Sequence, residues 1–142
     1  MTEPSRATLG ESLGALLDGA CRQYAGRPAT IDWRESLSYA ALSARAQLIA
    51  DDLAAAGAAP DEPVILMVCN RGVDFAAFLG VWRAACVAVP SHLASPPAVL
   101  AALIERTGAR FIVDDGRVRR LDRAAPPARL LLRGAALVIF SA

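Results

Sequence analysis

The sequence contains no lysine, because all 15 of its basic residues are arginine. This absence excludes a lysine nucleophile, a Schiff base and a P-loop lysine within the 142 residues. There is one histidine, His92, and the three cysteines are widely spaced. An odd number of distant cysteines forms neither a disulfide framework nor a zinc-binding pattern. We therefore predict no structural disulfide and no metal site.

Charge and long apolar runs are also scarce. Charged residues make up 20% of the chain and the formal net charge is +1, which provides no general attraction for nucleic acids or membranes. The apolar stretches are interrupted by Arg83 or by proline, and residues 1–9 lack the apolar centre of a signal peptide. We therefore expect a cytoplasmic protein with no nucleic-acid or membrane partner. The composition, rich in alanine and arginine, is typical of GC-rich coding sequences and suggests a bacterial origin.

Hydrophobic residues make up 55% of the chain, enough for one domain with a substantial core. Buried strands are predicted at residues 64–69, 86–90 and 110–113, where the residues for both sheet faces are apolar. Helices are predicted between these strands, with Asn70 and Ser95 as their caps. Right-handed crossovers would make the strands parallel. The predicted fold is therefore α/β, with a mostly parallel sheet and helices on both faces.

The segment before this unit predicts a helix, a small hairpin and a second helix. Thr8 and Glu11 have the spacing of a capping box at the start of the first helix. Residues 29–33 and 37–39 are typical of two short strands. Ser38 is expected to cap the second helix.

The segment after residue 113 predicts a polar loop followed by one more strand. Residues 114–133 are rich in arginine and proline, and this loop could contain a short strand at 130–132. The apolar residues 137–140 predict the last strand. Trp33 and Trp82 occupy core positions of the predicted strand and helix, so both are expected to pack in the interior.

Four stretches of the chain, in order, resemble motifs at the start of the adenylate-forming enzymes. This family includes acyl-CoA synthetases, aryl-CoA ligases and the adenylation domains of nonribosomal peptide synthetases. The stretches are LSYAAL at 37–42, DEPVILMVCN at 61–70, FLGVWRAACVAVP at 78–90 and ALVIFSA at 136–142. Their order and spacing carry the resemblance, which runs from about Leu13 onward. Ala41 replaces a common glutamate, Ala85 replaces a common glycine, and Ser141-Ala142 stands where Thr-Ser is usual.

The resemblance implies that residues 1–142 are the N-terminal α/β part of an AMP-binding ligase domain, ending just before the phosphate-binding loop. Such a ligase uses ATP and Mg²⁺ to convert a carboxylic acid into an acyl-adenylate. It then transfers the acyl group to the thiol of CoA or of a carrier protein. The motifs for ATP and the mobile lysine would follow this segment, so we expect no catalytic residue here and no activity from this chain alone. Its main partner would be the remainder of the ligase chain.

Arginine side chains after the third predicted strand are candidate CoA contacts. In synthetases similar to acetyl-CoA synthetase, the corresponding stretch can carry arginines near the CoA nucleotide, which suggests Arg117, Arg119 and Arg120 here. The turn containing His92 would lie nearby. Arginine suits phosphate because its planar group donates two parallel hydrogen bonds. A solvated surface loop is the simpler interpretation, since runs of charge usually face water.

Cys86 and Cys69 could each have a chemical role or act only in packing. Cys86 and His92 could form a nucleophile pair, but His92 lies six positions after Cys86 with a proline between them, and no acid is placed to orient the ring. Cys69 precedes a predicted helix N-terminus, which can make a thiol reactive. Buried cysteines more often act as small hydrophobic residues. We therefore favour packing roles for these cysteines and no chemistry at His92.

Two other classes of protein remain to be compared with the ligase segment. A stand-alone, non-catalytic α/β module for binding or assembly would keep the scaffold without the active site. A small Rossmann-like enzyme is disfavoured, because none of the predicted strands is followed by a glycine-rich turn. A segment of a larger core should leave apolar faces uncovered and self-associate, whereas a natural module should be monodisperse.

Overall fold

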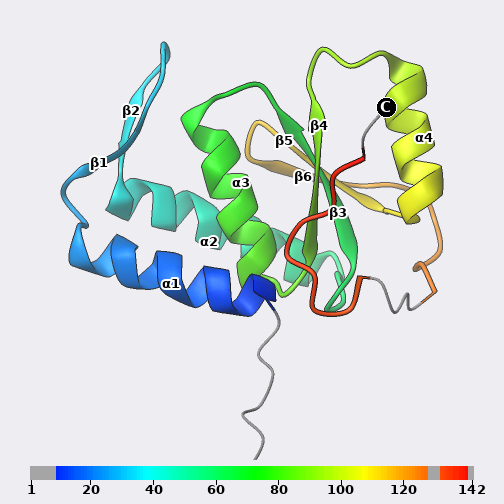
Figure 1. The fold of residues 1–142 in the computed structure, drawn as a ribbon, viewed down its shortest axis with the longest axis horizontal. Coiled ribbons are helices and arrows are strands. Elements are labelled where there is room, and N and C mark those ends of the chain that lie inside the picture. Colours follow the sequence, from blue (N-terminus) through cyan, green and yellow to red (C-terminus); the bar gives the residue numbers. More distant parts are fainter. Residues whose placement is uncertain (1–8, 128–131, 141–142) are drawn as a thin grey trace, which may run out of the picture.

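A four-stranded sheet with helices on both faces forms the centre of the protein (Figure 1). The structure, a computed structural model, describes residues 9–127 and 132–140. The elements, in order, are α1 Leu9–Gln23, β1 Pro28–Ile31, β2 Ser36–Ser38, α2 Tyr39–Ala55, β3 Pro63–Val68, α3 Gly72–Arg83, β4 Val87–His92, α4 Pro97–Thr107, β5 Phe111–Asp114 and β6 Arg117–Arg120.

The sheet has the strand order β4-β3-β5-β6. β3 pairs in parallel with β4 on one side and β5 on the other, whereas β6 runs antiparallel to β5. The connections from β3 to β4 and from β4 to β5 run across the sheet in opposite directions. Right-handed crossovers in opposite directions place α3 and α4 on opposite faces. The predicted α/β fold, with its β-α-β-α-β unit and its helices on both faces, is confirmed.

Alternation along β3 divides the core into two layers. Val64 and Leu66 pack toward Leu53 on the side of α2 and α3. Ile65, between them in sequence, packs toward Leu103 of α4. Burying such an aliphatic side chain contributes about 1.5–3 kcal/mol. Both faces of β3 are therefore covered, which explains its continuous apolar sequence.

The two helices that cover the first layer approach each other closely at Gly80. A Cβ atom at this position would lie 2.7 Å from the carbonyl oxygen of Ala46 and 2.8 Å from the Cβ of Ile49. Any side chain would therefore push α3 away from α2. Glycine allows this approach, which fixes α3 and the residues of its last turn against the rest of the fold.

The predicted cap of α2 is confirmed, but that of α3 is wrong. The hydroxyl of Ser38 accepts a hydrogen bond from the N–H of Ala41 at 3.1 Å. Asn70 does not cap α3, which begins at Gly72 after the cap residue Arg71. Asn70 instead has a φ of 61°, so it makes the turn between β3 and the helix. Asparagine tolerates this left-handed conformation better than most residues.

The predicted cap of α4 is also wrong, by one residue. Pro96, rather than Ser95, is the cap residue, and the helix begins at Pro97. A residue that precedes proline is disfavoured in the helical conformation, so the second proline keeps the first one outside the helix.

The β1–β2 hairpin is confirmed, but β1 ends at Ile31, so the turn begins two residues earlier than the predicted strand at 29–33 implied. The carboxylate of Asp32 accepts the N–H groups of Arg34 at 2.7 Å and Glu35 at 3.0 Å, which forms the turn. The prediction that Trp33 packs in the core is wrong, because this turn leaves its side chain 78% exposed. Its ring lies 4.7 Å from the Arg34 guanidinium carbon. Trp82 is only half-buried, so its expected interior position is not reached, although its ring stacks at a tilt on a neighbouring phenylalanine.

The loop predicted at residues 114–133 is partly wrong, because β6 lies within it. Asp115 and Gly116 have φ values of 49° and 76°, which reverse the chain in a two-residue hairpin turn. The strand predicted at 137–140 is reduced to a single parallel bridge between Leu137 and Ala88. Thr8 of the expected capping box and residues 130 and 131 of the expected short strand lie outside the described residues.

Candidate functional site

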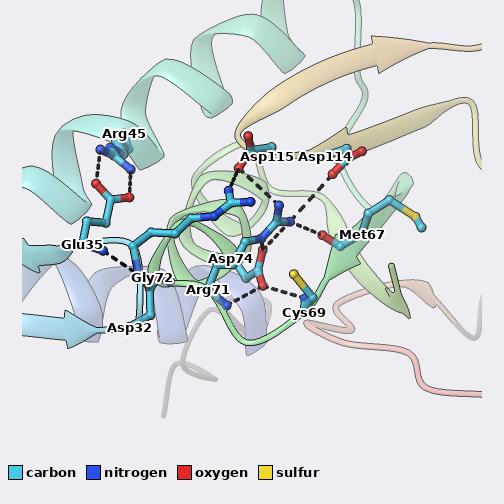
Figure 2. A network of polar contacts seen from close by, with 11 residues as sticks. Asp32, Glu35, Arg45, Met67, Cys69, Arg71, Gly72, Asp74, Asp114 and Asp115 are labelled. Carbon is cyan, nitrogen blue, oxygen red and sulfur yellow. Dashed lines mark hydrogen bonds and ion pairs between the residues drawn. The ribbon is translucent and has the colours of Figure 1, made fainter. Parts of the chain in front are cut away.

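The carboxyl edge of the sheet brings together the ends of three strands. β3, β4 and β5 are parallel, so Val68, His92 and Asp114 lie along the same edge. Ligands of open α/β sheets bind at this edge. Figure 2 shows the polar network that occupies it, between the ends of β3 and β5, the start of α3 and the hairpin.

Arg71 is the centre of this network, with a side chain only 4% exposed. Its Nε and Nη2 atoms donate to Asp74 Oδ1 at 3.2 and 3.0 Å. Nη1 donates to Asp115 Oδ1, and Nη2 also to the carbonyl oxygen of Met67, both at 3.2 Å. Burial disfavours its charge, but the Asp74 carboxylate outweighs this, so the pKa of Arg71 is raised. Because every nitrogen of the guanidinium is engaged, Arg71 serves the fold rather than a bound phosphate.

Asp74 completes the turn between β3 and α3. Its Oδ2 accepts the backbone N–H groups of Cys69 at 2.8 Å and Arg71 at 2.9 Å. The carboxylate lies in the first turn of α3, where the helix dipole favours negative charge. Neither Asp74 nor Arg71 was among the predicted site residues. The one local signal in the sequence was the position of this aspartate three residues after the cap.

Asp32 connects the hairpin to the same helix. Its Oδ2 accepts the N–H of Gly72 at 2.5 Å, at the first residue of α3. Glu35, on the other side of the turn, binds Arg45 of α2 through two hydrogen bonds of 2.6 and 2.8 Å. The backbone N–H of Gly72, followed by those of Arg34 and Glu35, lowers the pKa of Asp32. The hairpin is thus attached to α3 by one carboxylate and to α2 by the other.

These two carboxylates should make stability fall in acid. The Arg45 side chain lowers the pKa of Glu35, as the Gly72 N–H lowers that of Asp32, from usual values of 4.5 and 3.8. A folded-state pKa below the unfolded value means that the unfolded state takes up protons first. The stability that these two carboxylates contribute is therefore fully present at pH values above their usual pKa values. It is lost as the pH falls through their lower pKa values in the folded protein.

We expect the denaturant midpoint of Asp32→Asn to be lower than that of wild type near neutral pH and to converge on it as the pH falls below the usual carboxyl pKa of 3.8. Asp52→Asn, an exposed carboxylate of α2, is the control and should follow the wild-type curve. A difference between Asp32→Asn and wild type that is the same at every pH would contradict this assignment.

The predicted CoA contacts lie on β6 and β4, the two outer strands of the four. Arg117 and Arg119 are exposed and alternate with Val118, which packs against the core on the side of α2 and α3. Their side chains therefore belong to the face covered by α4. Arg120 lies at the opposite end of β6 and donates to the carbonyl oxygen of Ala56 at 3.2 Å. Arg117 is thus the arginine of this strand nearest the carboxyl edge.

His92 is the last residue of β4 and is exposed. Its Nδ1 accepts the N–H of Ala94 at 3.0 Å, which fixes the ring in the turn after the strand. Three strand spacings separate β4 from β6, about 14 Å. The structure does not bring His92 together with Arg117, so a ligand that touched both would have to span the sheet edge. Their role in CoA binding stays a prediction.

A pocket of about 450 Å³ lies between β4 and α4, next to His92. Its lining includes Ser91, Ser95, Val99 and Phe140. On the other face, an apolar groove of about 450 Å³ runs between α1 and α3. This groove is lined mainly by leucine and aromatic side chains, among them Leu17, Phe75, Phe78, Trp82 and Leu137. The segment after residue 136 therefore contributes a side chain to each of these hollows.

Cys86 and His92 do not form a pair, because they flank β4 at its two ends. The thiol of Cys86 is buried and donates to the carbonyl oxygen of Ala59 at 3.4 Å. Burial, with smaller contributions from the nearby carboxylates of Glu62 and Asp61, raises the pKa of Cys86 to about 12. The thiol is therefore protonated at neutral pH and acts as a small hydrophobic residue.

We expect Cys86 to resist alkylation by iodoacetamide in the folded protein. A pKa of about 12 against the usual 9.0 lowers the thiolate fraction at pH 8 by about 1,000-fold, and burial slows access further. Peptide mass spectrometry should show Cys86 modified at least about 100-fold more slowly than in the denatured chain. Equal labelling in both states would contradict the buried, protonated thiol.

Within 9–127 and 132–140, no cluster of three or more His, Cys, Asp or Glu side chains is arranged to hold a metal ion. The guanidinium of the buried Arg71 already binds the carboxylates of Asp74 and Asp115. None of the helices in these ranges is long and apolar enough to cross a membrane.

Comparison with known proteins places this arrangement in a family. The family model for AMP-binding enzymes matches residues 17–137. The AMB antimetabolite synthetase AmbE of Pseudomonas aeruginosa is 35% identical over 113 residues, which are 77% of this chain and 5% of that protein. A naringenin synthase of Pestalotiopsis fici is 38% identical over 100 residues, 68% of this chain and 4% of that protein. The chain thus spans about a twentieth of the length of these curated relatives.

Solved structures share the fold. A benzoate CoA ligase from Burkholderia xenovorans LB400 is similar with a TM-score of 0.66 and 24% identity, over 90% of this chain and 25% of that one. The N-terminal subdomain of Klebsiella oxytoca NpsA is similar with a TM-score of 0.65 and 18% identity, over 91% and 31% of the two chains. The chain therefore belongs to the family of AMP-binding enzymes and has the fold of an N-terminal segment of its adenylate-forming members.

Proposed function

We propose that this chain is the N-terminal part of an ATP-dependent, AMP-forming carboxylate ligase. The parent protein would convert a carboxylic acid and ATP into an acyl-adenylate and pyrophosphate. It would then pass the acyl group to a thiol of CoA or of a carrier protein. The match of the AMP-binding family model to residues 17–137 is the observation that carries this proposal.

The role of this chain in the ligase is structural support rather than chemistry. Its sheet supplies the surface on which residues 136–138 are laid beside β4, and these residues precede the proposed phosphate-binding loop. The residues that bind ATP and Mg²⁺ would lie in the remainder of the ligase. We therefore expect residues 1–142 alone to be inactive. The Arg- and Ala-rich composition is the reason to propose a bacterial ligase.

Arg117, Arg119 and His92 remain the proposed CoA contacts. The exposed guanidinium groups of β6 could bind phosphate, and Arg117 lies nearest the carboxyl edge. Arg120 is the weakest of the proposed contacts, because it already binds the end of α2. If CoA is the acceptor, Arg117→Ala should raise the KM for CoA and leave adenylate formation unchanged. Arg22→Ala, an exposed arginine at the end of α1, is the matched control.

The experiment that tests the function is carboxylate-dependent exchange of pyrophosphate into ATP, measured on the longer gene product that contains this chain. Solved relatives are described with benzoate CoA ligase activity or with bound L-aspartate, so the panel should contain aryl acids and amino acids. Exchange with one of these acids supports the ligase. Absence of exchange with the whole panel, in a folded protein, counts against it.

A non-catalytic module for binding or assembly is the alternative. Large apolar side chains stand exposed around the groove and the terminal segment, with Leu16 at 72%, Phe75 at 60% and Ile139 at 70%. Such uncovered surface favours a piece of a larger core, which should self-associate in isolation. Sedimentation velocity on residues 1–142 should therefore show dimers or larger species. A monodisperse monomer, together with a stop codon after Ala142, would favour the module.

A further inference from the structure

The segment at 136–138 is held on the sheet by few backbone contacts. The carbonyl oxygen of Ala136 accepts the N–H of Ala88 at 3.0 Å, and the N–H of Val138 donates to the carbonyl oxygen of Ala88 at 2.9 Å. These two bonds make one parallel bridge beside β4. Each such bond contributes only about 0.5–1.5 kcal/mol net. By themselves they would allow this segment to open or to shift along β4.

A side chain from α3 supplies a third contact. The indole Nε1 of Trp82 donates to the same carbonyl oxygen of Ala136 at 2.8 Å. This oxygen therefore accepts two donors, one from the neighbouring strand and one from the covering helix. At residue 134, the backbone N–H donates to Asp61 Oδ1 at 3.0 Å. The chain is thus bound from three directions just before it runs along β4.

The indole is well placed to fix the position of the segment. Trp82 lies in the last turn of α3, and its ring centroid lies 5.7 Å from that of Phe78 on the same helix. The helix itself is fixed against α2 by the close approach at Gly80. A tryptophan has only two side-chain torsions, so a packed ring loses little further freedom when its N–H binds. We call the hydrogen bond from Trp82 to Ala136 the tether. It holds the carbonyl oxygen of Ala136 at a fixed position relative to α3.

We propose that Trp82 is a positioning residue of the ligase, whose indole N–H sets the register of residues 136–140 and thereby the phosphate-binding loop that follows them. This inference rests on the proposed function for its last step, since the loop belongs to the parent ligase. The tether itself depends only on described contacts. Trp82 acts through Ala136 and touches no substrate in this scheme.

The first test measures amide hydrogen exchange in residues 1–142. Replacing Trp82 with 3-benzothienylalanine keeps the shape of the ring and exchanges the N–H for sulfur, so the core should stay packed. Exchange at Val138 should become about three- to tenfold faster, as expected for the loss of one hydrogen bond. Exchange at Ile112, in the middle of the sheet, reports global opening, which also breaks this hydrogen bond, so it should accelerate no more than exchange at Val138 does. Unchanged exchange at Val138, or a larger acceleration at Ile112 than at Val138, would overturn the tether.

Trp82→Phe is the genetically simpler variant, and Trp33→Phe is its matched control. The control makes the same chemical change at a ring that is 78% exposed in the hairpin turn. Trp82→Phe should accelerate exchange at Val138, and Trp33→Phe should leave it unchanged. Equal exchange rates at Val138 in the two variants would contradict a specific role of the Trp82 indole.

The second test uses the longer gene product and separates positioning from folding. A variant that merely folds less well loses active molecules, which lowers kcat and leaves the KM for ATP unchanged. A displaced phosphate loop should raise the KM for ATP, by about three- to tenfold if one hydrogen bond is lost. An unchanged KM with altered exchange at Val138 would overturn the link to the loop. If the wild-type protein forms no adenylate at all, the proposed function fails. The amide hydrogen exchange experiment still decides whether the Trp82 tether exists.

Discussion

Replacing Arg71 with leucine should lower the free energy of unfolding by about 3–5 kcal/mol. The substitution removes the guanidinium that faces the buried carboxylate of Asp74, which is 5% exposed. A charge left without its partner in the interior costs far more than the pair contributes. Unfolding in guanidinium chloride, followed by circular dichroism, measures the decrease in the free energy of unfolding. The network would then open at the point where β3, α3 and the β5–β6 turn meet.

Arg45→Leu is the matched control for Arg71→Leu. It removes an ion pair with better geometry, since both hydrogen bonds to Glu35 are shorter than 3 Å. The side chains of Arg45 and Glu35 are, however, 40% and 35% exposed, so water can replace the partner. We expect a loss of at most about 1 kcal/mol. If the two variants lost similar amounts, burial would not be the cause.

Arg110→Leu should destabilise the opposite edge of the sheet by about 3–5 kcal/mol. Arg110 and Glu62 are 8% and 4% exposed, and Nη2 of the arginine donates to Glu62 Oε2 at 3.1 Å. The same nitrogen binds the carbonyl oxygen of Gly57 at 2.9 Å, so the variant also frees the end of α2. Thermal and denaturant unfolding should both report the loss.

The double variant Glu62→Leu/Arg110→Leu separates the pair from its surroundings. Removing both charges abolishes the unpaired buried carboxylate that Arg110→Leu leaves behind. The double variant should therefore be more stable than Arg110→Leu alone, although the N–H of Ala59 loses its acceptor on Glu62. Additive losses in the two single variants would show that the charges do not interact.

The sheet could be predicted because its strands are covered on both faces. Burial on both sides requires apolar residues at every position, and Val64 to Val68 satisfy this without exception. The helices followed from their length and from the residues at their ends. The exact caps of α3 and α4 did not, because the left-handed conformation of Asn70 and the Pro96-Pro97 pair shifted each helix start by one residue.

β6 could not be predicted from hydrophobic pattern. An edge strand needs few buried side chains, and among its four residues only Val118 packs on the core. The signal lay in the turn before it, where Asp115-Gly116 is a favoured pair for a two-residue hairpin. Arginines on both sides of that valine concealed the alternation.

The polar network was hidden from the sequence for a different reason. Arg71 is followed closely by Asp74, but its partner Asp115 lies 44 residues away, beyond two helices and two strands. Only the strand order β4-β3-β5 brings the turn after β5 to the start of α3. Conversely, Arg117 and His92 were predicted as neighbours, whereas that same order sets them on outer strands.

The strand order also gives the sheet a direction of growth. On one side, β6 ends the sheet with three exposed arginines, and charge of this kind discourages another strand from adding there. On the other side, β4 has already accepted the start of a further strand at Leu137. The sheet therefore has one edge, β6, that disfavours further pairing and one edge, β4, where pairing has begun. A larger protein that contains this segment would therefore extend its sheet more readily past β4 than past β6.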